Sequence, residues 1–197
     1  MRIAPGRVQL GIDRGDYWQI AAVIPKGGYS GVRSAGLATF RASVARLGPE
    51  FADRVSQIET WDDVKVLSVR VDRLRRWYAP GVLFVGDAAH AMSPIGGVGI
   101  NLAVQDAVAA ARILAEPIRQ RRLNSQVLAK VQARRRFPTV GTQALQVALQ
   151  RAVLGRVLAA DLPVTAPRAL QVLRRFPALQ AIPARVVGVG LRPERLN

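Results

Sequence analysis

Cysteine is absent from this chain, and histidine occurs once, at His90. Without cysteine the chain has no disulfide, no thiolate nucleophile and no cysteine-ligated metal, and a single histidine excludes a histidine-rich metal site. The composition therefore predicts that the protein binds no metal. A reducing, intracellular location fits the lack of cysteine, and we predict a cytoplasmic protein.

Long uninterrupted apolar runs are also missing. The N-terminal segment, residues 1–15, contains no apolar core of the kind found in secretory signals. The two longest uncharged stretches, residues 91–105 and 137–150, are broken by Gly, Pro, Asn or Gln and do not resemble a membrane span. The sequence predicts no transmembrane segment.

Acidic residues and lysines are few. The 197 residues contain 29 Lys+Arg against 13 Asp+Glu, which gives a net charge of +16, and lysine occurs only at Lys26, Lys65 and Lys130. Arginines cluster at residues 73–76, 119–122 and 134–136, which raises a nucleic acid or an anionic surface as a partner. Because a run of charge usually marks a solvated face, a basic binding module is the alternative interpretation, and no specific nucleic acid is expected.

The two Gly-rich phosphate-binding fingerprints, GxGxxG and GxxxxGK[ST], do not occur. What the first third of the chain does contain is a β-hairpin pattern: residues 7–13 alternate apolar and polar, 14–16 form a turn, and 17–24 make the second strand. Residues 64–71 are predicted as a third strand of the same sheet. A helix over 30–47, stopped by Gly48-Pro49, and a short helical piece over 50–58 lie between them.

The centre of the chain is organised differently. An apolar strand, Val82–Val85, ends at Gly86-Asp87, and a loop rich in Gly and Pro leads to a helix that begins near Gly99. Helices are predicted over 123–136 and 139–158, with Pro138 breaking or kinking the pair, and over 166–175. We expect an α/β protein, α+β within these residues, in three parts: 1–78, 79–117 and 118–197.

The strand, loop and helix in series form a candidate binding site, because ligands lie at the carboxyl ends of strands in such units. The Asp87 carboxylate suits sugar or polyol hydroxyls and is a poor neighbour for phosphate. Gly96, Gly97 and Gly99 allow close approach of a flat ring or a positive φ. Asn101 can cap the helix or donate its amide, and the first helical turn attracts negative charge. The alternative is that the glycines form a tight turn and Asp87 only caps a helix.

Protein-based catalysis has no support in this stretch. His90 has no Asp or Ser next to it in the sequence, and we predict a structural role for it. Ser93 lacks the frame of a nucleophile elbow. The sequence therefore assigns no catalytic residue.

The central stretch carries a resemblance to a known family. Residues 86–90, Gly-Asp-Ala-Ala-His, followed by Pro94, Gly97, Gly99, Asn101 and Asp106-Ala107, resemble the second flavin-binding motif of FAD-dependent aromatic-ring monooxygenases of the para-hydroxybenzoate hydroxylase-like family. Residues 17–19 and the turn at 24–27 resemble its substrate-domain sheet, and the later helices its C-terminal region. The resemblance implies a partial fold of that family: a small antiparallel sheet, one strand-loop-helix unit of the flavin domain and a helical region.

The same resemblance implies FAD as the cofactor and NAD(P)H as its electron donor. Asp87 would bind the ribityl chain of FAD and Pro94 would lie beside the flavin ring and the substrate. The pyrimidine edge of the ring would lie along the loop formed by Gly96, Gly97, Val98, Gly99, Ile100 and Asn101. Tyr17, Trp18, Gln19 and Pro94 would face an organic, aromatic or polycyclic substrate, which the reduced cofactor hydroxylates or epoxidises with O₂.

The missing GxGxxG unit is the departure from the family, because it would anchor the FAD pyrophosphate. We therefore interpret the chain as the C-terminal part of such an enzyme, weak or inactive alone: a truncated product, a fragment, a subunit completed by an N-terminal half, or an inactive gene remnant. The strand at 82–85 also lacks the parallel partners that would bury it. An exposed sheet edge and helix face are expected, which favour a partner or self-association.

Overall fold

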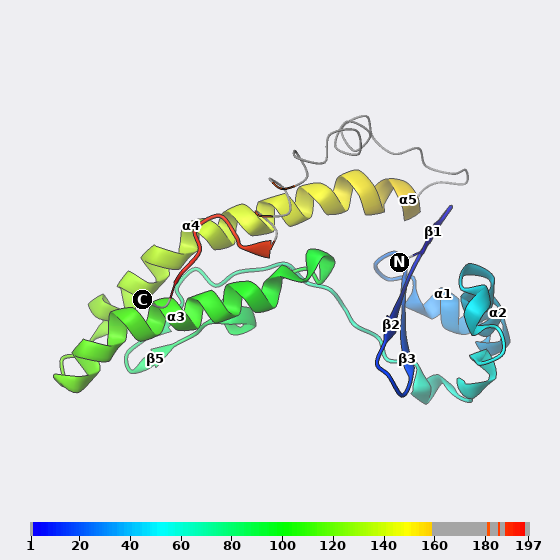
Figure 1. Ribbon diagram of the computed structural model, residues 1–197, viewed down its shortest axis with the longest axis horizontal. Helices are drawn as coiled ribbons and strands as arrows, with labels where there is room; N and C mark the ends of the chain where they lie inside the picture. The colour runs from blue at the N-terminus through cyan, green and yellow to red at the C-terminus, as the bar shows by residue number, and fades with distance from the viewer. Residues whose placement is uncertain (1, 159–180, 182–184, 186–187, 196–197) are drawn as a thin grey trace. The chain divides into compact units, whose positions relative to one another are not determined.

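The computed structural model describes residues 2–158, 181, 185 and 188–195. The chain divides into two compact units, which are described separately: Met1–Ser68 with Arg151–Thr165, and Val69–Gln150 with Ala166–Asn197 (Figure 1). The three-part division expected above remains a prediction. The two units are defined by contacts within the chain, whereas the three parts were defined by resemblance to the domains of a family. The helix predicted over 166–175 lies outside the described residues.

The first unit contains a three-stranded antiparallel sheet, in the order β1 (Arg2–Ala4), β2 (Arg7–Asp13), β3 (Trp18–Val23). The predicted hairpin is confirmed, and its turn is closed by the Gly15 amide, which donates to Asp13 Oδ1 at 2.8 Å. The third strand predicted over 64–71 is wrong: this segment has no strand conformation, and β1 pairs with β2 instead. The strand propensity of a segment reflects how well its side chains pack against a neighbouring strand. The sequence of residues 64–71 alone does not show whether a neighbouring strand is present.

Two helices and three short 3₁₀ turns accompany this sheet: α1 (Tyr29–Ser34), α2 (Leu37–Leu47), η1 (Pro49–Phe51), η2 (Val55–Gln57) and η3 (Trp61–Asp63). The single helix predicted over 30–47 is two helices, because Gly36 has a φ of 88° and ends the first. The predicted stop at Gly48-Pro49 is confirmed, and the piece expected over 50–58 is the pair η1 and η2.

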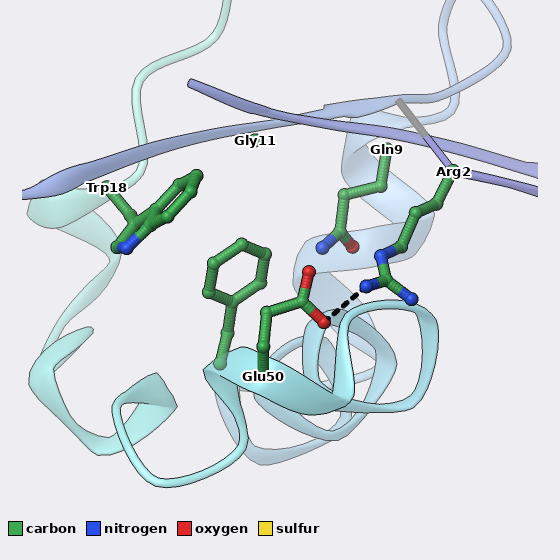
Figure 2. Close-up of a pocket in the computed structure, with 6 residues that line it drawn as sticks. Arg2, Gln9, Gly11, Trp18 and Glu50 are labelled. Atoms are coloured by element: carbon green, nitrogen blue, oxygen red, sulfur yellow. Dashed lines mark ion pairs between the residues drawn. The ribbon is translucent and has the colours of Figure 1, made fainter. Parts of the chain in front are cut away.

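Alternation along the strands gives this sheet a covered face and an open face. Gln9 and Trp18 lie on the covered face, as Figure 2 shows beside the Arg2–Glu50 ion pair. Gln9 Nε2 donates to the Val44 carbonyl of α2 at 3.4 Å, and the rings of Trp18 and Phe51 are 5.2 Å apart. The opposite face is buried at Val8 and more open farther along, where it carries Leu10, Ile12, Gln19 and Ala21.

The second unit begins with a short antiparallel pair, β4 (Tyr78–Ala79) and β5 (Val82–Leu83). The strand predicted over Val82–Val85 is shorter than expected, because only Val82 and Leu83 pair. Val82 and Phe84 are exposed, in agreement with the exposed edge expected for a strand without its parallel partners. Strands of a parallel sheet are buried on both faces by partners, and no parallel strand is present in the part of the chain that the structure describes.

Two long helices, α3 (Val98–Arg119) and α4 (Ser125–Leu149), pack side by side in this unit (Figure 1). Helix α3 begins where the sequence predicted. Asn124 caps α4, since its Oδ1 accepts from the amides of Gln126 and Val127 at 3.0 Å. The core between the helices is formed by apolar side chains: Leu114, Leu128 and Val131, with Tyr78, Leu83, Ala110, Ile113 and Val127 around them.

The sequence predicted that Pro138 breaks or kinks the helix pair, and the break is wrong, because α4 runs through this residue without interruption. Proline removes one helical N–H, but Pro138 is completely buried, and the packing around it keeps the helix continuous. A π-helical segment (Gln150–Gly155) and α5 (Arg156–Leu158) follow. Within the first unit, the Gly6 amide donates to the Val157 carbonyl at 2.9 Å.

Among the described helices, α3 alone is long and apolar enough, by length and composition, to cross a membrane. One such helix is weak support for a membrane span, since a core helix of a soluble protein passes the same test. One stripe of α3 packs on α4, as expected of a helix in a folded domain.

Candidate functional site

The site predicted from the sequence is built on the first turns of α3. The 3₁₀ turn η4 (Gly86–Ala88) lies on this helix, and Gly86 has a φ of 57°. A Cβ at Gly86 would lie 2.9 Å from Cβ of Ala103, so only glycine allows this approach. Ala103 is five residues into α3, about 7 Å along its axis from the N-terminus. The turn therefore presents the exposed side chain of Asp87 close to the beginning of the helix.

The glycine loop ends in a helix N-terminus that carries no side-chain cap. Gly96 and Gly97, in η5 (Ile95–Gly97), have φ values of 82° and 64°, and α3 starts at Val98. The N-cap residue, Gly97, has no side chain that could accept from the first amides of α3. Pro94, Gly96 and Gly97 are exposed, so a ligand can reach backbone N–H groups that carry partial positive charge.

The remaining predicted loop residues contribute unequally. Val98 is buried and Gly99 half-buried, so these two offer mainly their backbone, while Ile100 is exposed. Asn101 is exposed as well, but its amide already donates to the Gly188 carbonyl at 3.0 Å. A ligand that used this amide would displace or share that bond.

Three predicted substrate-facing residues lie in the first unit, and they do not share a face. Trp18 packs against Phe51 on the covered face of the sheet. Gln19, one residue on, lies on the open face, where its Oε1 accepts from Arg14 at 2.7 and 3.0 Å. Tyr17 is exposed before the strand begins. Because neighbouring strand residues point to opposite sides, Trp18 and Gln19 cannot face one ligand together.

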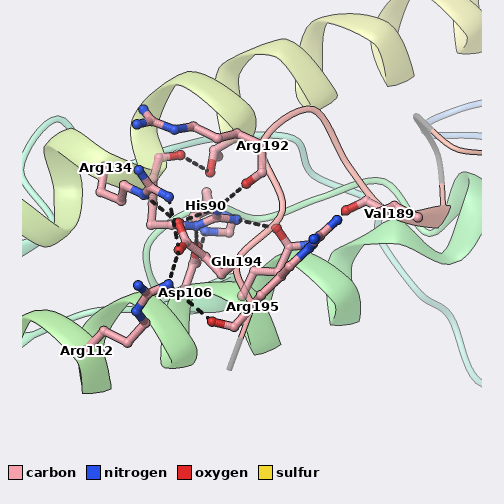
Figure 3. A network of polar contacts seen from close by, with 11 residues as sticks. His90, Asp106, Arg112, Arg134, Val189, Arg192, Glu194 and Arg195 are labelled. Carbon is pink, nitrogen blue, oxygen red and sulfur yellow. Dashed lines mark hydrogen bonds and ion pairs between the residues drawn. The ribbon is translucent and has the colours of Figure 1, made fainter. Parts of the chain in front are cut away.

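Beneath the exposed loop is a buried polar network that the sequence reading missed (Figure 3). Asp106, in α3, is fully buried, and its Oδ2 accepts from His90 Nε2 at 2.5 Å and from the Gly86 amide at 3.2 Å. Its Oδ1 accepts from Arg135 Nε of α4 at 2.8 Å. Three partners from two segments, the turn at 86–90 and α4, thus share one carboxylate.

His90 and Arg135 are as deeply buried as the carboxylate. The His90 ring also packs on Trp77, with 4.9 Å between ring centroids, and its Nδ1 has no hydrogen-bond partner among the described residues. Complete burial fits the structural role predicted for His90, although its acidic partner is present 16 residues away, where adjacency in sequence could not reveal it.

The protonation of Asp106 follows from these contacts. Burial works to raise the pKa of its carboxyl, but the hydrogen bonds from His90 and Arg135 outweigh it, so the pKa lies below the ordinary value of 3.8. The carboxylate is therefore ionised at neutral pH and acts only as an acceptor, which makes His90 Nε2 the donor.

A second carboxylate, Glu194, ties the segment 188–195 to both helices. Arg134 donates two hydrogen bonds to the Glu194 carboxylate, from Nε at 2.7 Å and from Nη2 at 3.2 Å. Guanidinium nitrogens of Arg112 and Arg135 lie 3.8 and 3.7 Å from its oxygens. Its side chain is only 2% exposed. The hydrogen bonds from Arg134 hold the pKa of Glu194 below its ordinary value of 4.5.

A depressed carboxyl pKa contributes stability above its unfolded value and loses it as the pH falls through the folded value. We therefore expect the free energy of unfolding to decline below about pH 4.5, and Glu194→Gln to flatten that decline while costing about 1–3 kcal/mol at pH 7. Urea denaturation between pH 3 and 7 measures both effects. The exposed Glu116→Gln is the matched control, and equal pH profiles for the two variants would contradict the assignment.

Two glutamines of α4 donate hydrogen bonds to the backbone of the loop that precedes α3. Gln143 Nε2 donates to the carbonyls of Asp72 and Ala91, at 2.7 and 3.0 Å, and Gln146 Nε2 donates to the Ser93 carbonyl at 2.8 Å. A sequence signal existed for this support. Within the uncharged stretch 137–150, polar residues recur at helical spacing and are buried: Thr139, Thr142, Gln143 and Gln146.

The described residues contain no group of three or more His, Asp or Glu side chains that could hold a metal ion. The chemistry that the site offers is instead that of acceptor and donor groups around a glycine-lined surface. It fits a large, flat ligand that carries hydroxyl groups and partial negative charge.

Comparison with known proteins gives a matching family and similar proteins. A family model described as FAD binding domain matches residues 22–146. The 6-methylpretetramide 4-monooxygenase of Streptomyces rimosus is 39% identical over 174 residues, which are 87% of this chain and 41% of that protein. The kynurenine 3-monooxygenase of Stenotrophomonas maltophilia is 40% identical over 72 residues, 34% of this chain and 16% of that enzyme.

Two crystal structures of PqsL from Pseudomonas aeruginosa are similar in fold. One contains 2-aminobenzoylacetate and has a TM-score of 0.54 at 25% identity, covering 72% of this chain and 39% of PqsL. The other, described as "a probable FAD-dependent monooxygenase", has a TM-score of 0.54 at 26% identity, covering 72% and 40%. The chain spans about two fifths of the length of the first of these relatives and of PqsL.

Proposed function

Since this chain belongs to the FAD binding domain family and has the partial fold of FAD-dependent aromatic-ring monooxygenases, we propose that it forms the flavin-ring part of such an enzyme. When bound, FAD supplies the redox chemistry, which is the hydroxylation or epoxidation of an organic substrate with O₂. NAD(P)H is the electron donor that reduces the flavin. One observation carries the proposal: the turn that bears the exposed Asp87 carboxylate packs on Ala103 in the first turns of α3, and the N-cap of α3 is a glycine without a side-chain cap.

In this proposal, the residues of this chain bind FAD and polarise its flavin ring. Asp87 accepts hydrogen bonds from the hydroxyls of the ribityl chain, and Gly96 and Gly97 let the flat ring approach the backbone. The first amides of α3 favour negative charge on the ring. Pro94, exposed next to this loop, offers a rigid wall beside ring and substrate. The pyrophosphate of FAD has no cradle of the GxGxxG type in this sequence.

An aromatic or polycyclic substrate is supported by the relatives, which are named for 6-methylpretetramide and kynurenine, and by the 2-aminobenzoylacetate bound to PqsL. In this chain the open face of the sheet, with Leu10, Ile12 and Gln19, offers an apolar wall with one amide. Tyr17 and Trp18 remain weaker candidates, because Trp18 is engaged with Phe51. We place the protein in the cytoplasm on the strength of its cysteine-free composition.

We expect Asp87→Ala to weaken FAD binding about tenfold or more, because a charged acceptor of hydroxyl groups is lost. Stability should not change, since the side chain is exposed. FAD absorbance titrations measure the affinity, with the chain alone and with an upstream flavin half supplied as a second polypeptide. The chain alone should bind weakly, because the pyrophosphate anchor is missing.

Asp53→Ala, which removes another exposed carboxylate, is the control. The assignment fails if neither form of the titration shifts the flavin spectrum and Asp87→Ala changes nothing. The same result would favour an inactive gene remnant.

The alternative of a basic binding module loses part of its support in the structure. Arg134 and Arg135 are held by Glu194 and Asp106, and Arg73 donates to Gln143 at 2.6 Å. The arginines at 119–122 remain on the surface, as do Arg75, Arg76 and Arg136. A salt-sensitive complex with DNA or RNA in a gel-shift assay would revive this alternative.

A partner surface runs along α3, opposite the stripe that packs on α4. The exposed residues recur at helical spacing: Ile100, Val104, Ala107, Ala111, Ala115 and Ile118. We propose that this apolar stripe is covered by a flavin-domain half supplied with this chain or, without it, by self-association, because an exposed apolar row of this length is a contact surface.

Val104→Glu should therefore abolish concentration-dependent association at micromolar levels, because a charge in the stripe is costly to bury. Sedimentation velocity measures the association, with circular dichroism to confirm that the variant is folded. Leu67→Glu, at a residue 78% exposed outside the stripe, is the control. A monomeric wild-type chain that also fails to bind the upstream half would contradict the proposal.

A further inference from the structure

We propose that Asp106 is a positioning residue for the flavin site: its carboxylate fixes the turn that presents Asp87. The inference rests on the proposed function, because Asp87 is the residue assigned to FAD. Asp106 itself is fully buried and touches no exposed part of the site.

The contacts hold the turn at both of its ends. Oδ2 of Asp106 accepts from the Gly86 amide before Asp87 and from the His90 ring after it, at 3.2 and 2.5 Å. The turn is closed on itself as well, since the Gly86 carbonyl accepts from the amides of Ala89 and His90, both at 2.9 Å. With both ends held on α3, the backbone at Asp87 has little freedom to move.

The other oxygen of Asp106 connects the turn to α4. Arg135 Nε donates to Oδ1 at 2.8 Å, and α4 also holds the following loop segment through Gln143 and Gln146. The turn at 86–90 and the loop that follows it are therefore both held in place by α3 and α4. Figure 3 shows this carboxylate between His90 and the arginine cluster around Glu194.

The alternative is that Asp106 only adds to the stability of the second unit, as Glu194 does. The two carboxylates make a matched pair for separating these roles, because both are buried and bonded to arginines. The described partners of Glu194 are Arg112, Arg134 and Arg135, and none of them lies in the turn. Asp106→Asn keeps the size of the side chain and replaces one acceptor oxygen by a donor. Glu194→Gln makes the same change at the other site.

Hydrogen exchange of the full chain, followed by NMR, gives a readout that needs no flavin. In the wild type, the Gly86 amide should exchange as slowly as the amides of core residues such as Leu114 and Val131. In Asp106→Asn, exchange at Gly86 and His90 should accelerate at least tenfold relative to those core amides. In Glu194→Gln the ratio should not change.

FAD titration of the same variants adds the functional readout. Asp106→Asn should weaken FAD binding by about the same factor as Asp87→Ala, while Glu194→Gln should leave the affinity within twofold of wild type. If the wild type does not bind FAD under either condition of the titration, the proposed function fails, and hydrogen exchange alone decides whether Asp106 holds the turn.

Several results would overturn the proposal. One is a Gly86 amide that exchanges fast in the wild type, which is informative even if Asp106→Asn does not fold. Others are a Gly86 amide that stays protected in Asp106→Asn, or equal losses of protection at the turn in both variants. FAD binding by Asp106→Asn as tight as wild type would also contradict it.

Discussion

Asp106→Ala is expected to lower the free energy of unfolding by about 3–5 kcal/mol, because the buried Arg135 guanidinium loses the carboxylate to which it donates and keeps the more distant carboxylate of Glu194, at 3.7 Å. The Gly86 amide and His90 Nε2 lose their acceptor at the same time. This cost is a large fraction of the stability of an ordinary domain, so the variant is expected to be folded only marginally at 25 °C. Urea denaturation followed by circular dichroism measures it.

The double variant Asp106→Leu with Arg135→Met tests the reason for the loss. Removing both charges eliminates the Arg135 guanidinium that Asp106→Ala leaves without its bonded carboxylate. Replacement of a buried ion pair by apolar side chains is often neutral or stabilising. We expect the pair to recover most of the stability that Asp106→Ala loses. A loss under 1 kcal/mol in Asp106→Ala, or a double variant as unstable as the single one, would show that the pair does not carry this energy.

The second large effect is expected at Gly86. Its φ of 57° is unfavourable for a residue with a side chain, and a Cβ there would come within 2.9 Å of Ala103. Strain of about 1–2 kcal/mol and overpacking of about 1–3 kcal/mol together predict a loss of about 2–5 kcal/mol for Gly86→Ala. Urea denaturation measures the loss, and FAD binding should fall with it, because the turn carries Asp87.

Gly97→Ala is the matched control, because Gly97 has a similar φ of 64° but open space around the position of a Cβ. It should cost only the conformational part, about 1–2 kcal/mol. Adding Ala103→Gly to Gly86→Ala should recover the steric part and not the conformational part. A Gly86→Ala variant no less stable than Gly97→Ala would contradict the close approach of turn and helix.

The flavin motif could be predicted from the sequence because its residues are close together along the chain. Spacing alone placed a strand end, a glycine loop and a helix start within residues 82–101, and the resemblance added FAD; the family match and the similar folds confirm this interpretation. The hairpin over 7–24 was predictable for the same reason: alternation and a turn are local signals. The assignment of individual residues to FAD and substrate remains a prediction.

Only the tertiary structure decided which distant residues support that motif. His90, Asp106 and Arg135 are separated by 16 and 29 residues, and a charged pair in an Ala-rich or Arg-rich stretch looks like solvated surface until packing buries it. Packing also kept α4 continuous through Pro138, gave the sheet edge to β1 and not to residues 64–71, and placed Trp18 and Gln19 on opposite faces. Local patterns determined the identity of the flavin loop, whereas burial, strand pairing and buried charge, which depend on contacts far apart in the chain, determined what holds it in place.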